Sequence, residues 1–232
     1  MIDHYDWAGG REAMMRFGPV GGPVVVAVLP LFEEANRTRT FLTGLLRLLA
    51  ERGIAGALPD LPGQGESLVA TKHAMLAGWR TALASAAHAA AGERPVHILS
   101  LRGGALLDHG VKAASRWQFA PAKGEALVRE LFRTSAAAGQ RIEIDLANYN
   151  DEGGPVTIAG NLLSRPLLRD LNAADCVRDG TVRVVRLETD PAVADRKVEG
   201  PPLWRQSEPG DDPVLATLLA DDVADWIARC AS

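Results

Sequence analysis

The chain has little of what disulfide frameworks, metal centres or nucleic-acid surfaces require. Its two cysteines, Cys176 and Cys230, are too few and too isolated for a disulfide framework or a metal set, so we expect free thiols and no metal. The 25 Lys and Arg are outnumbered by 29 Asp and Glu, which argues against binding to nucleic acid. Its glycine pairs do not form a phosphate-binding loop, and no cofactor is expected.

Long apolar runs are missing as well. No segment approaches the ~20 apolar residues that a membrane helix needs. The first residues, Met-Ile-Asp-His-Tyr-Asp, lack the basic region and apolar stretch of a signal peptide. The composition, 47% hydrophobic and 23% charged, is ordinary for a globular protein with a substantial core. These features predict a soluble cytoplasmic protein with one domain over residues 1–232, and a homodimer is compatible with them.

What is present is an alternation of strand and helix patterns. Continuous apolar runs such as 23–29 are typical of strands buried on both faces, and leucines at helical spacing follow this run. The alternation predicts an α/β fold with a mostly parallel central sheet and helices on both faces. The predicted strands are 2–7, 11–17, 23–29, 54–58, 95–99, 117–120, 142–147, 155–160 and 181–188. The predicted helices are 37–52, 74–91, 104–114, 123–138, 164–174 and 213–229.

The segment from Ile98 to Gly104 has the pattern of a nucleophile elbow. In a G-x-S-x-G elbow, a strand enters a sharp turn and then a helix, and the serine at the apex is exposed above the sheet. Here the apex position is Arg102, and Ser100 stands two residues earlier, where elbows usually have glycine. A guanidinium is always protonated and cannot attack a carbonyl. The turn is therefore predicted to be present without its nucleophile.

A second motif, Asp60 to Ser67, reads D-x-x-G-x-G-x-S after a buried strand and resembles the corresponding loop of α/β-hydrolases. The chain is further similar to hydrolases encoded with exosortase A systems in bacterial exopolysaccharide clusters. This resemblance implies an α/β-hydrolase fold with at most a small cap, at 122–153, and a role in exopolysaccharide metabolism. The segments that carry the closer resemblance are 30–37, 101–107, 117–118, 158–163 and 202–208.

The resemblance does not bring a catalytic triad with it. In the α/β-hydrolase fold the triad follows the chain order Ser, then Asp or Glu, then His. The nucleophile position is Arg102, and no histidine follows the last predicted strand at 181–188. A serine without a general base is a poor nucleophile at neutral pH, so ordinary serine hydrolysis is not expected. The five histidines are His4, His73, His88, His97 and His109.

Several polar residues are expected to meet Arg102, because the loops after parallel strands converge at the carboxyl edge of the sheet. In one reading, Arg102 pairs with Glu33 or Glu34 and orders the site. In the other, Arg102 and the elbow amides hold an anion such as a carboxylate, a phosphate or an acidic sugar. An adjacent arginine should lower the pKa of a carboxylate and weaken it as a base. The predicted ligand-binding residues are Arg102, Leu101, Gly103, Glu33, Glu34, Asn36, Arg37 and Trp204.

Two functional hypotheses stay open. The first is a pseudoenzyme: a non-catalytic or atypical binding or accessory protein in which Arg102 anchors a small anionic, acyl or sugar ligand. The second is a hydrolase or acyl transferase for an ester or thioester, in which Glu33, Glu34 or Glu208 activates water or a bound alcohol. Asp190 and Glu208 are expected to join the cluster around Arg102. The pairs Asp211-Asp212 and Asp221-Asp222 are interpreted as helix N-terminal charge and solvated surface.

Overall fold

A computed structural model describes residues 1–140 and 153–231, and the strand predicted at 142–147 lies outside them. Eight strands form one sheet, and only β2 runs against the other seven. This confirms the predicted mostly parallel sheet. In sheet order the strands are β1 (Ile2–Trp7), β2 (Gly10–Phe17), β4 (Ala55–Pro59), β3 (Val24–Val28), β5 (Val96–Leu101), β6 (Ser115–Phe119), β9 (Val182–Leu187) and β10 (Arg196–Val198).

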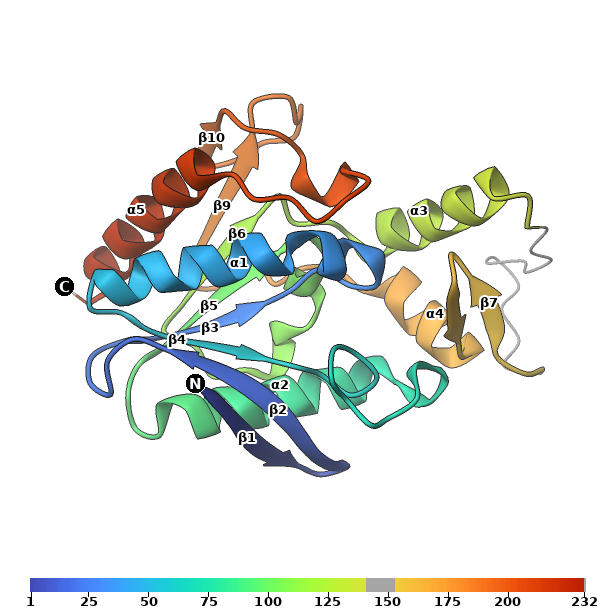
Figure 1. The fold of residues 1–232 in the computed structure, drawn as a ribbon, viewed down its shortest axis with the longest axis horizontal. Helices are drawn as coiled ribbons and strands as arrows, with labels where there is room; N and C mark the ends of the chain where they lie inside the picture. The colour runs from blue at the N-terminus through green and yellow to red at the C-terminus, as the bar shows by residue number, and fades with distance from the viewer. Residues whose placement is uncertain (141–152, 232) are drawn as a thin grey trace.

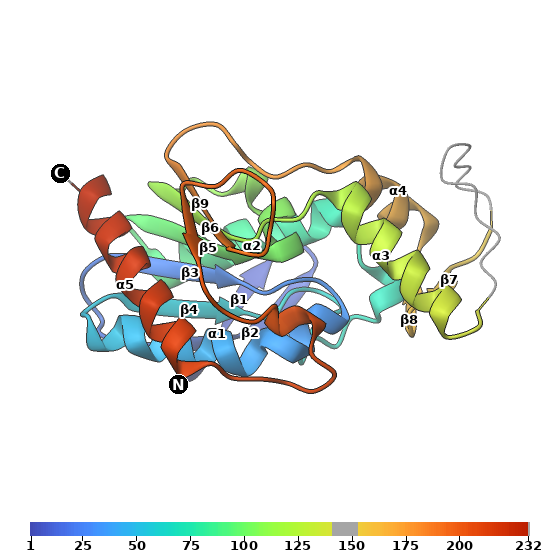
Figure 2. The same ribbon diagram turned by 90° about the horizontal axis from the view of Figure 1, so that it is seen from above.

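Helices cover both faces of this sheet, as the sequence predicts. The helices α1 (Glu33–Glu51) and α5 (Pro213–Cys230) pack on one face, and α2 (Leu76–Ala91) covers the other (Figures 1 and 2). All five residues of β3 are buried because the strand is covered on both sides. None of the described helices is long and apolar enough to cross a membrane.

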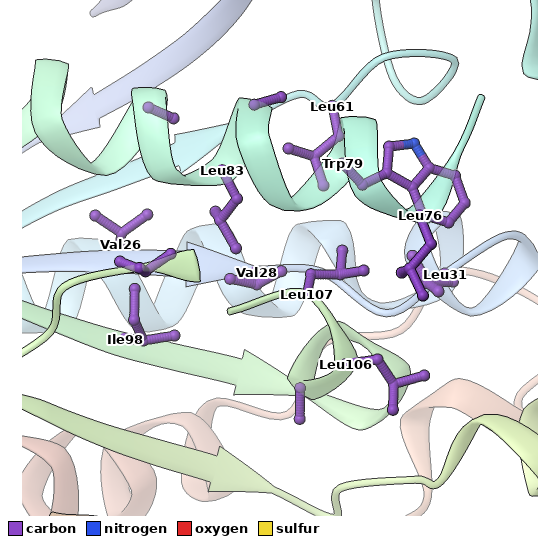
Figure 3. Packing of buried hydrophobic residues seen from close by; sticks show 14 of the residues in the cluster. Val26, Val28, Leu31, Leu61, Leu76, Trp79, Leu83, Ile98, Leu106 and Leu107 are labelled. Carbon is purple, nitrogen blue, oxygen red and sulfur yellow. The ribbon is translucent and has the colours of Figure 1, made fainter. Parts of the chain in front are cut away.

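The core between β3 and α2 supports the carboxyl edge of the sheet. Val26 and Val28 of β3 face Leu83 and Trp79 of α2 (Figure 3). The Trp79 indole nitrogen donates a hydrogen bond to the carbonyl of Pro62, at 2.7 Å. Since that contact joins the helix to the loop after β4, it fixes the D-x-x-G-x-G-x-S loop against the core.

A smaller group of elements lies beyond the carboxyl ends of the central strands (Figure 1). It comprises α3 (Gly124–Ala137), α4 (Arg165–Ala173) and a hairpin of β7 (Val156–Ile158) and β8 (Asn161–Leu163). The strand predicted at 155–160 is shortened to β7, which lies outside the main sheet and pairs with β8, because the chain turns at Ala159-Gly160, where both φ angles are positive. Helix α3 lies within the segment 122–153 that was predicted to be a small cap.

The connection after β5 differs most from prediction. Instead of one helix over 104–114, it holds two 3-10 turns, η2 (Arg102–Leu106) and η3 (Asp108–Gly110). Arg116 of β6 pairs with the Asp108 carboxylate at 2.8 Å and also donates to the Val111 carbonyl, at 2.9 Å. These contacts hold the short connection against β6. The Val111 carbonyl accepts from Arg116 and not from a backbone amide of an α-helix. Two further 3-10 turns are η1 (Thr71–His73) and η4 (Leu203–Arg205), and strand β10 was not predicted.

Candidate functional site

Three non-glycine residues with positive φ angles lie at the carboxyl edge of the central strands. Phe32, Arg102 and Ala120 follow β3, β5 and β6, and their φ angles are 59°, 51° and 46°. In the described part of the chain only one other non-glycine residue, Ala159, has a positive φ. Such conformations are unfavourable for L-residues and concentrate at functional sites. This edge is also where open α/β sheets bind ligands.

The elbow predicted from the sequence is present after β5. Gly104 is required there, because a Cβ at this position would lie 2.5 Å from the Leu29 carbonyl oxygen. Ser100 is fully buried, and its hydroxyl has no hydrogen-bond partner among residues 1–140 and 153–231. It therefore fills the position of the first elbow glycine and cannot meet a substrate. Because the following helix is only a 3-10 turn, the expected helix N-terminus does not support an anion there.

Arg102, at the apex, is held by three neighbours. Its Nε and Nη2 atoms donate to the Glu34 carboxylate at 3.3 and 3.2 Å, and Nη1 donates to the Ala120 carbonyl at 3.2 Å. The guanidinium carbon lies 4.7 Å from the centroid of the Trp204 ring, in cation–π geometry. Glu34 is thus the carboxylate that Arg102 selects from the predicted pair, and the side chain of Glu33 is exposed.

Glu34 lies in the first turn of α1, which begins four residues earlier than predicted because the chain turns sharply at Phe32. Its side chain is 15% exposed. Burial raises the pKa of Glu34 above its ordinary value, although Arg102 and Arg37 oppose the shift. Arg102 does lower the pKa of Glu34, as expected, but the expectation of a net lowering is wrong, because the loss of hydration outweighs one fork of long hydrogen bonds.

Trp204 stands in η4, in the segment after β10 where a triad histidine would follow the last strands. Its ring contacts Phe119 edge-on with centroids 5.9 Å apart. Arg37 donates to the Trp204 carbonyl at 3.1 Å, so this predicted ligand-binding side chain orients η4. Leu101 packs in the core beneath α1 and α5, and Gly103 is buried against Leu127. Their side-chain positions therefore face the protein interior.

Two carboxylates that were expected to join the cluster around Arg102 do not pair with it. Asp190 accepts a hydrogen bond from Arg186 at 2.6 Å and another from the Ala192 amide, so its charge is matched beside β9. Glu208 is exposed in the segment between η4 and α5. Neither is hydrogen-bonded to Arg102 in the described part of the chain. This corrects the expectation that they would join its cluster.

The motif residues of the D-x-x-G-x-G-x-S loop, Asp60, Gly63, Gly65 and Ser67, stabilise the conformation of the loop itself. Asp60 pairs with Arg39 at 2.8 Å and accepts from the Glu66 amide, at 3.2 Å. Gly65 has a φ of 56°, and a Cβ there would lie 2.2 Å from the Asp60 carboxylate. Ser67 accepts from the Gly63 amide at 2.9 Å. The motif therefore holds the loop after β4 in a defined conformation beside the carboxyl edge.

Three further groups, His97, His109 and Cys176, are poor candidates for a base or a nucleophile. His97, near the start of β5, is buried against the Ser115 hydroxyl at 2.8 Å, and burial lowers its pKa. The His109 ring contacts the Asp175 carbonyl at 2.7 Å. Burial raises the pKa of the Cys176 thiol to about 11, which leaves it unreactive. Within 1–140 and 153–231, no group of His, Cys, Asp or Glu could hold a metal ion.

Solved structures of low sequence identity share this architecture along the whole chain. Est1E from Butyrivibrio proteoclasticus, in a structure with ferulic acid bound, is 15% identical, with a TM-score of 0.64 over 99% of both chains. Alpha/beta hydrolase domain-containing protein 10 from mouse is 14% identical, with a TM-score of 0.60 over 99% of both chains. The bottromycin epimerase BotH, in complex with bottromycin A2, is 13% identical, with a TM-score of 0.55 over 100% of this chain and 99% of that one. This chain has the α/β-hydrolase fold.

No model of a known protein family matches the sequence, and no curated protein matches it. At these identities the likeness establishes the fold and leaves the chemistry to the site itself. In the α/β-hydrolase fold the apex of the elbow carries the nucleophile, and the loop after β3 supplies an oxyanion-hole N–H. In this chain the apex of the elbow carries the guanidinium of Arg102. The helix that follows the loop after β3 carries the carboxylate of Glu34 in its first turn.

Proposed function

We propose that this α/β-hydrolase-fold protein is a pseudoenzyme that binds a small ligand at its former elbow and performs no serine hydrolysis. The observation that carries the proposal is the strained apex residue Arg102, which is paired with Glu34 and stacked on Trp204. A serine nucleophile needs an exposed hydroxyl and a neighbouring base. Ser100 is buried without such a base, and an aromatic ring stands near the apex in place of histidine.

The ligand that fits the apex is a small anion. A guanidinium has five N–H donors, and the three hydrogen bonds described above leave two of them for a carboxylate, a phosphate or an acidic sugar. The resemblance of the 101–107 and 202–208 segments to exosortase-associated hydrolases supports an accessory role in exopolysaccharide metabolism, in the cytoplasm.

The proposal is tested with a panel of chromogenic esters and a fluorophosphonate probe on the intact chain. We expect no turnover above a heat-treated control and no labelled serine. Binding of acetate and inorganic phosphate is then measured by calorimetry for the wild type and for Arg102→Ala. Weaker binding by the variant, with retained folding, supports the anion site; equal binding rejects it, and rapid ester turnover rejects the pseudoenzyme.

One observation favours the second candidate, a hydrolase or acyl transferase for esters or thioesters. The raised pKa of Glu34 brings a half-buried carboxylate beside the elbow closer to the range of an effective general base. In that role Glu34 would activate water or a bound alcohol, and Arg102 would bind the developing oxyanion. If the ester panel shows turnover, Glu34→Gln should abolish it, whereas Glu33→Gln and Glu208→Gln should leave it intact.

A further inference from the structure

A separate pocket of about 250 Å³ opens beside the beginning of α1. Three segments that are far apart in sequence surround it: the first turns of α1, the loop after β4 and the β7–β8 hairpin. The chain turns with a positive φ angle at Phe32, before α1, and at Gly65, in the loop after β4. The pocket is lined by Phe32, Glu33, Ala35, Asn36, Gly63, Gln64, Gly65, Thr71 and Asn161.

Side-chain amides dominate the polar lining. Asn36, Gln64 and Asn161 come from three different segments and converge on this pocket. The Gln64 amide nitrogen is buried and finds no hydrogen-bond partner in the two described ranges of the chain. A buried unpaired donor is costly, so this nitrogen favours a ligand oxygen. It lies between the small space around Asp60 and the pocket itself, lining both.

The side chains of Asn161 and Thr71 each keep an oxygen that can accept a hydrogen bond from a ligand. Asn161 donates through its amide nitrogen to the Ala159 carbonyl at 2.8 Å, which leaves its side-chain oxygen to accept. Thr71 donates its hydroxyl to the Gly63 carbonyl at 3.1 Å, which leaves the lone pairs of that oxygen. The pocket therefore offers donors and acceptors together, and a ligand hydroxyl can satisfy both at once.

Charge and size narrow the ligand class. Among the lining residues within 1–140 and 153–231, Glu33 is the single charged one and none is Lys, Arg or His, so this lining opposes anions. Phe32 adds an aromatic side chain, held edge-on against Trp79 with centroids 6.2 Å apart. The volume is below the roughly 300–1,000 Å³ of pockets for drug-sized molecules. One small ring with several hydroxyl groups and an apolar face fits this description.

We propose that the pocket formed by Asn36, Gln64, Thr71 and Asn161 binds a neutral, hydroxyl-rich ligand of the size of one sugar ring. This assignment deepens the ligand-binding role proposed above and rests on it, but it uses none of the residues that touch Arg102.

The test uses D-glucose, D-galactose, D-mannose and N-acetyl-D-glucosamine as probes of the intact chain. Ligand-observed NMR detects binding, and a titration gives its dissociation constant. We expect at least one neutral sugar to bind. Gln64→Leu should weaken that binding about tenfold, because one buried donor is lost. Gln140→Leu, the same substitution at an exposed glutamine outside the pocket, should change nothing.

Asn36→Ala provides a second variant, because its side chain is exposed on α1 and its removal should not disturb folding. Weakening by both pocket variants supports the assignment. The absence of binding by all four sugars, or equal affinities for Gln64→Leu, Asn36→Ala and Gln140→Leu, would overturn it. Ester turnover with sugar binding intact overturns only the pseudoenzyme proposal, whereas inert esters without sugar binding overturn only the pocket assignment.

Discussion

Two arginine–carboxylate clusters in this molecule have the same chemistry and opposite electrostatic outcomes. Beneath α5, Asp222 accepts two hydrogen bonds from Arg183 at 2.8 Å, one from Arg196 at 2.7 Å and one from Trp117 at 2.8 Å. At the elbow, the side-chain hydrogen bonds that Glu34 accepts from the described residues are the fork from Arg102, at 3.2 and 3.3 Å. The pKa of Asp222 is held well below its ordinary value, mainly by these donors against the effect of burial, whereas burial raises the pKa of Glu34.

The difference teaches that the number and length of hydrogen bonds decide whether a buried charge is stabilised. Four short bonds more than replace the hydration of Asp222, and two long ones do not replace that of Glu34. The first cluster is therefore built for stability, since it joins β6, β9, β10 and α5. In the second cluster the charge of Glu34 is only partly compensated by hydrogen bonds. This cluster lies at the carboxyl edge, where positive φ angles also occur, and both features are typical of functional sites.

The largest effect is expected at Asp222. Asp222→Ala leaves Arg183 with its charge unpaired in a partly buried position and removes the acceptor of the Trp117 indole. Breaking such a pair destabilises a protein by about 3–5 kcal/mol. Urea unfolding followed by circular dichroism measures the free energy of unfolding. The neighbouring Asp221→Ala removes only an exposed pair with Arg52 and should cost less than about 1 kcal/mol; similar losses for both variants would contradict the comparison.

Arg102→Ala should have an intermediate effect. The substitution leaves the Glu34 carboxylate without its fork and removes the cation above Trp204. Burial already raises the pKa of Glu34, and loss of the guanidinium raises it further, so protonation can relieve part of the loss; we expect about 2 kcal/mol. In a protein of this size the melting temperature should fall by roughly 4–8 °C. A loss as large as that of Asp222→Ala would show that the elbow pair is as well compensated as the cluster beneath α5.

The sequence predicts the frame of the molecule better than its electrostatics. Continuous apolar runs such as Val24–Val28 identify the central parallel strands, and the pair Gly103-Gly104 locates the elbow. Chain topology predicts that Glu33 or Glu34 meets Arg102, since both loops follow parallel strands, and the structure shows that Glu34 is the partner. Asp212 also caps α5 as expected for helix N-terminal charge, accepting from the Leu215 amide at 2.9 Å.

What the sequence does not reveal depends on three-dimensional contacts. The sign of the Glu34 shift requires knowing how many donors reach the carboxylate and how deeply it is buried. Asp222 was interpreted as solvated surface, and that interpretation is wrong, because its side chain is 2% exposed. A helical signal was available: Asp222 follows Leu215 and Leu219 by seven and three residues, the spacing of the buried face of α5.

Trp204→Phe should have a smaller effect and tests whether the aromatic ring strengthens the elbow pair. Phenylalanine keeps a ring near Phe119 but gives a weaker cation–π contact with Arg102, so we expect a loss of about 1 kcal/mol. A double-mutant cycle with Arg102→Ala isolates the coupling of the two side chains. If Trp204→Phe has the same cost with and without Arg102, the stack does not contribute to holding the guanidinium.

Glu34→Gln should have the smallest effect at neutral pH. Glutamine keeps an oxygen that can accept from Arg102 and avoids burial of a charge, so the free energy of unfolding should change by less than about 1 kcal/mol. Glu33→Gln, on the exposed neighbour, is the matched control. Asp222→Asn should instead be strongly destabilising, because its carboxylate charge is favoured by the fold.

The pH dependence of these variants gives the sharpest form of the comparison. The folded-state pKa of Glu34 is raised, so its contribution to stability is fully present below the ordinary glutamate pKa and is lost as pH rises through the folded value. Glu34→Gln should therefore look most favourable, relative to the wild type, near pH 7 and least favourable near pH 4.

The pH dependence of Asp222 has the opposite sign: its contribution to stability is present above the ordinary aspartate pKa and is lost only as pH falls below it. The deficit of Asp222→Asn should consequently stay constant from pH 7 to pH 5 and shrink in stronger acid. Parallel urea titrations of the two variants across this range decide the matter, because equal signs would mean that the elbow carboxylate is stabilised as an anion after all.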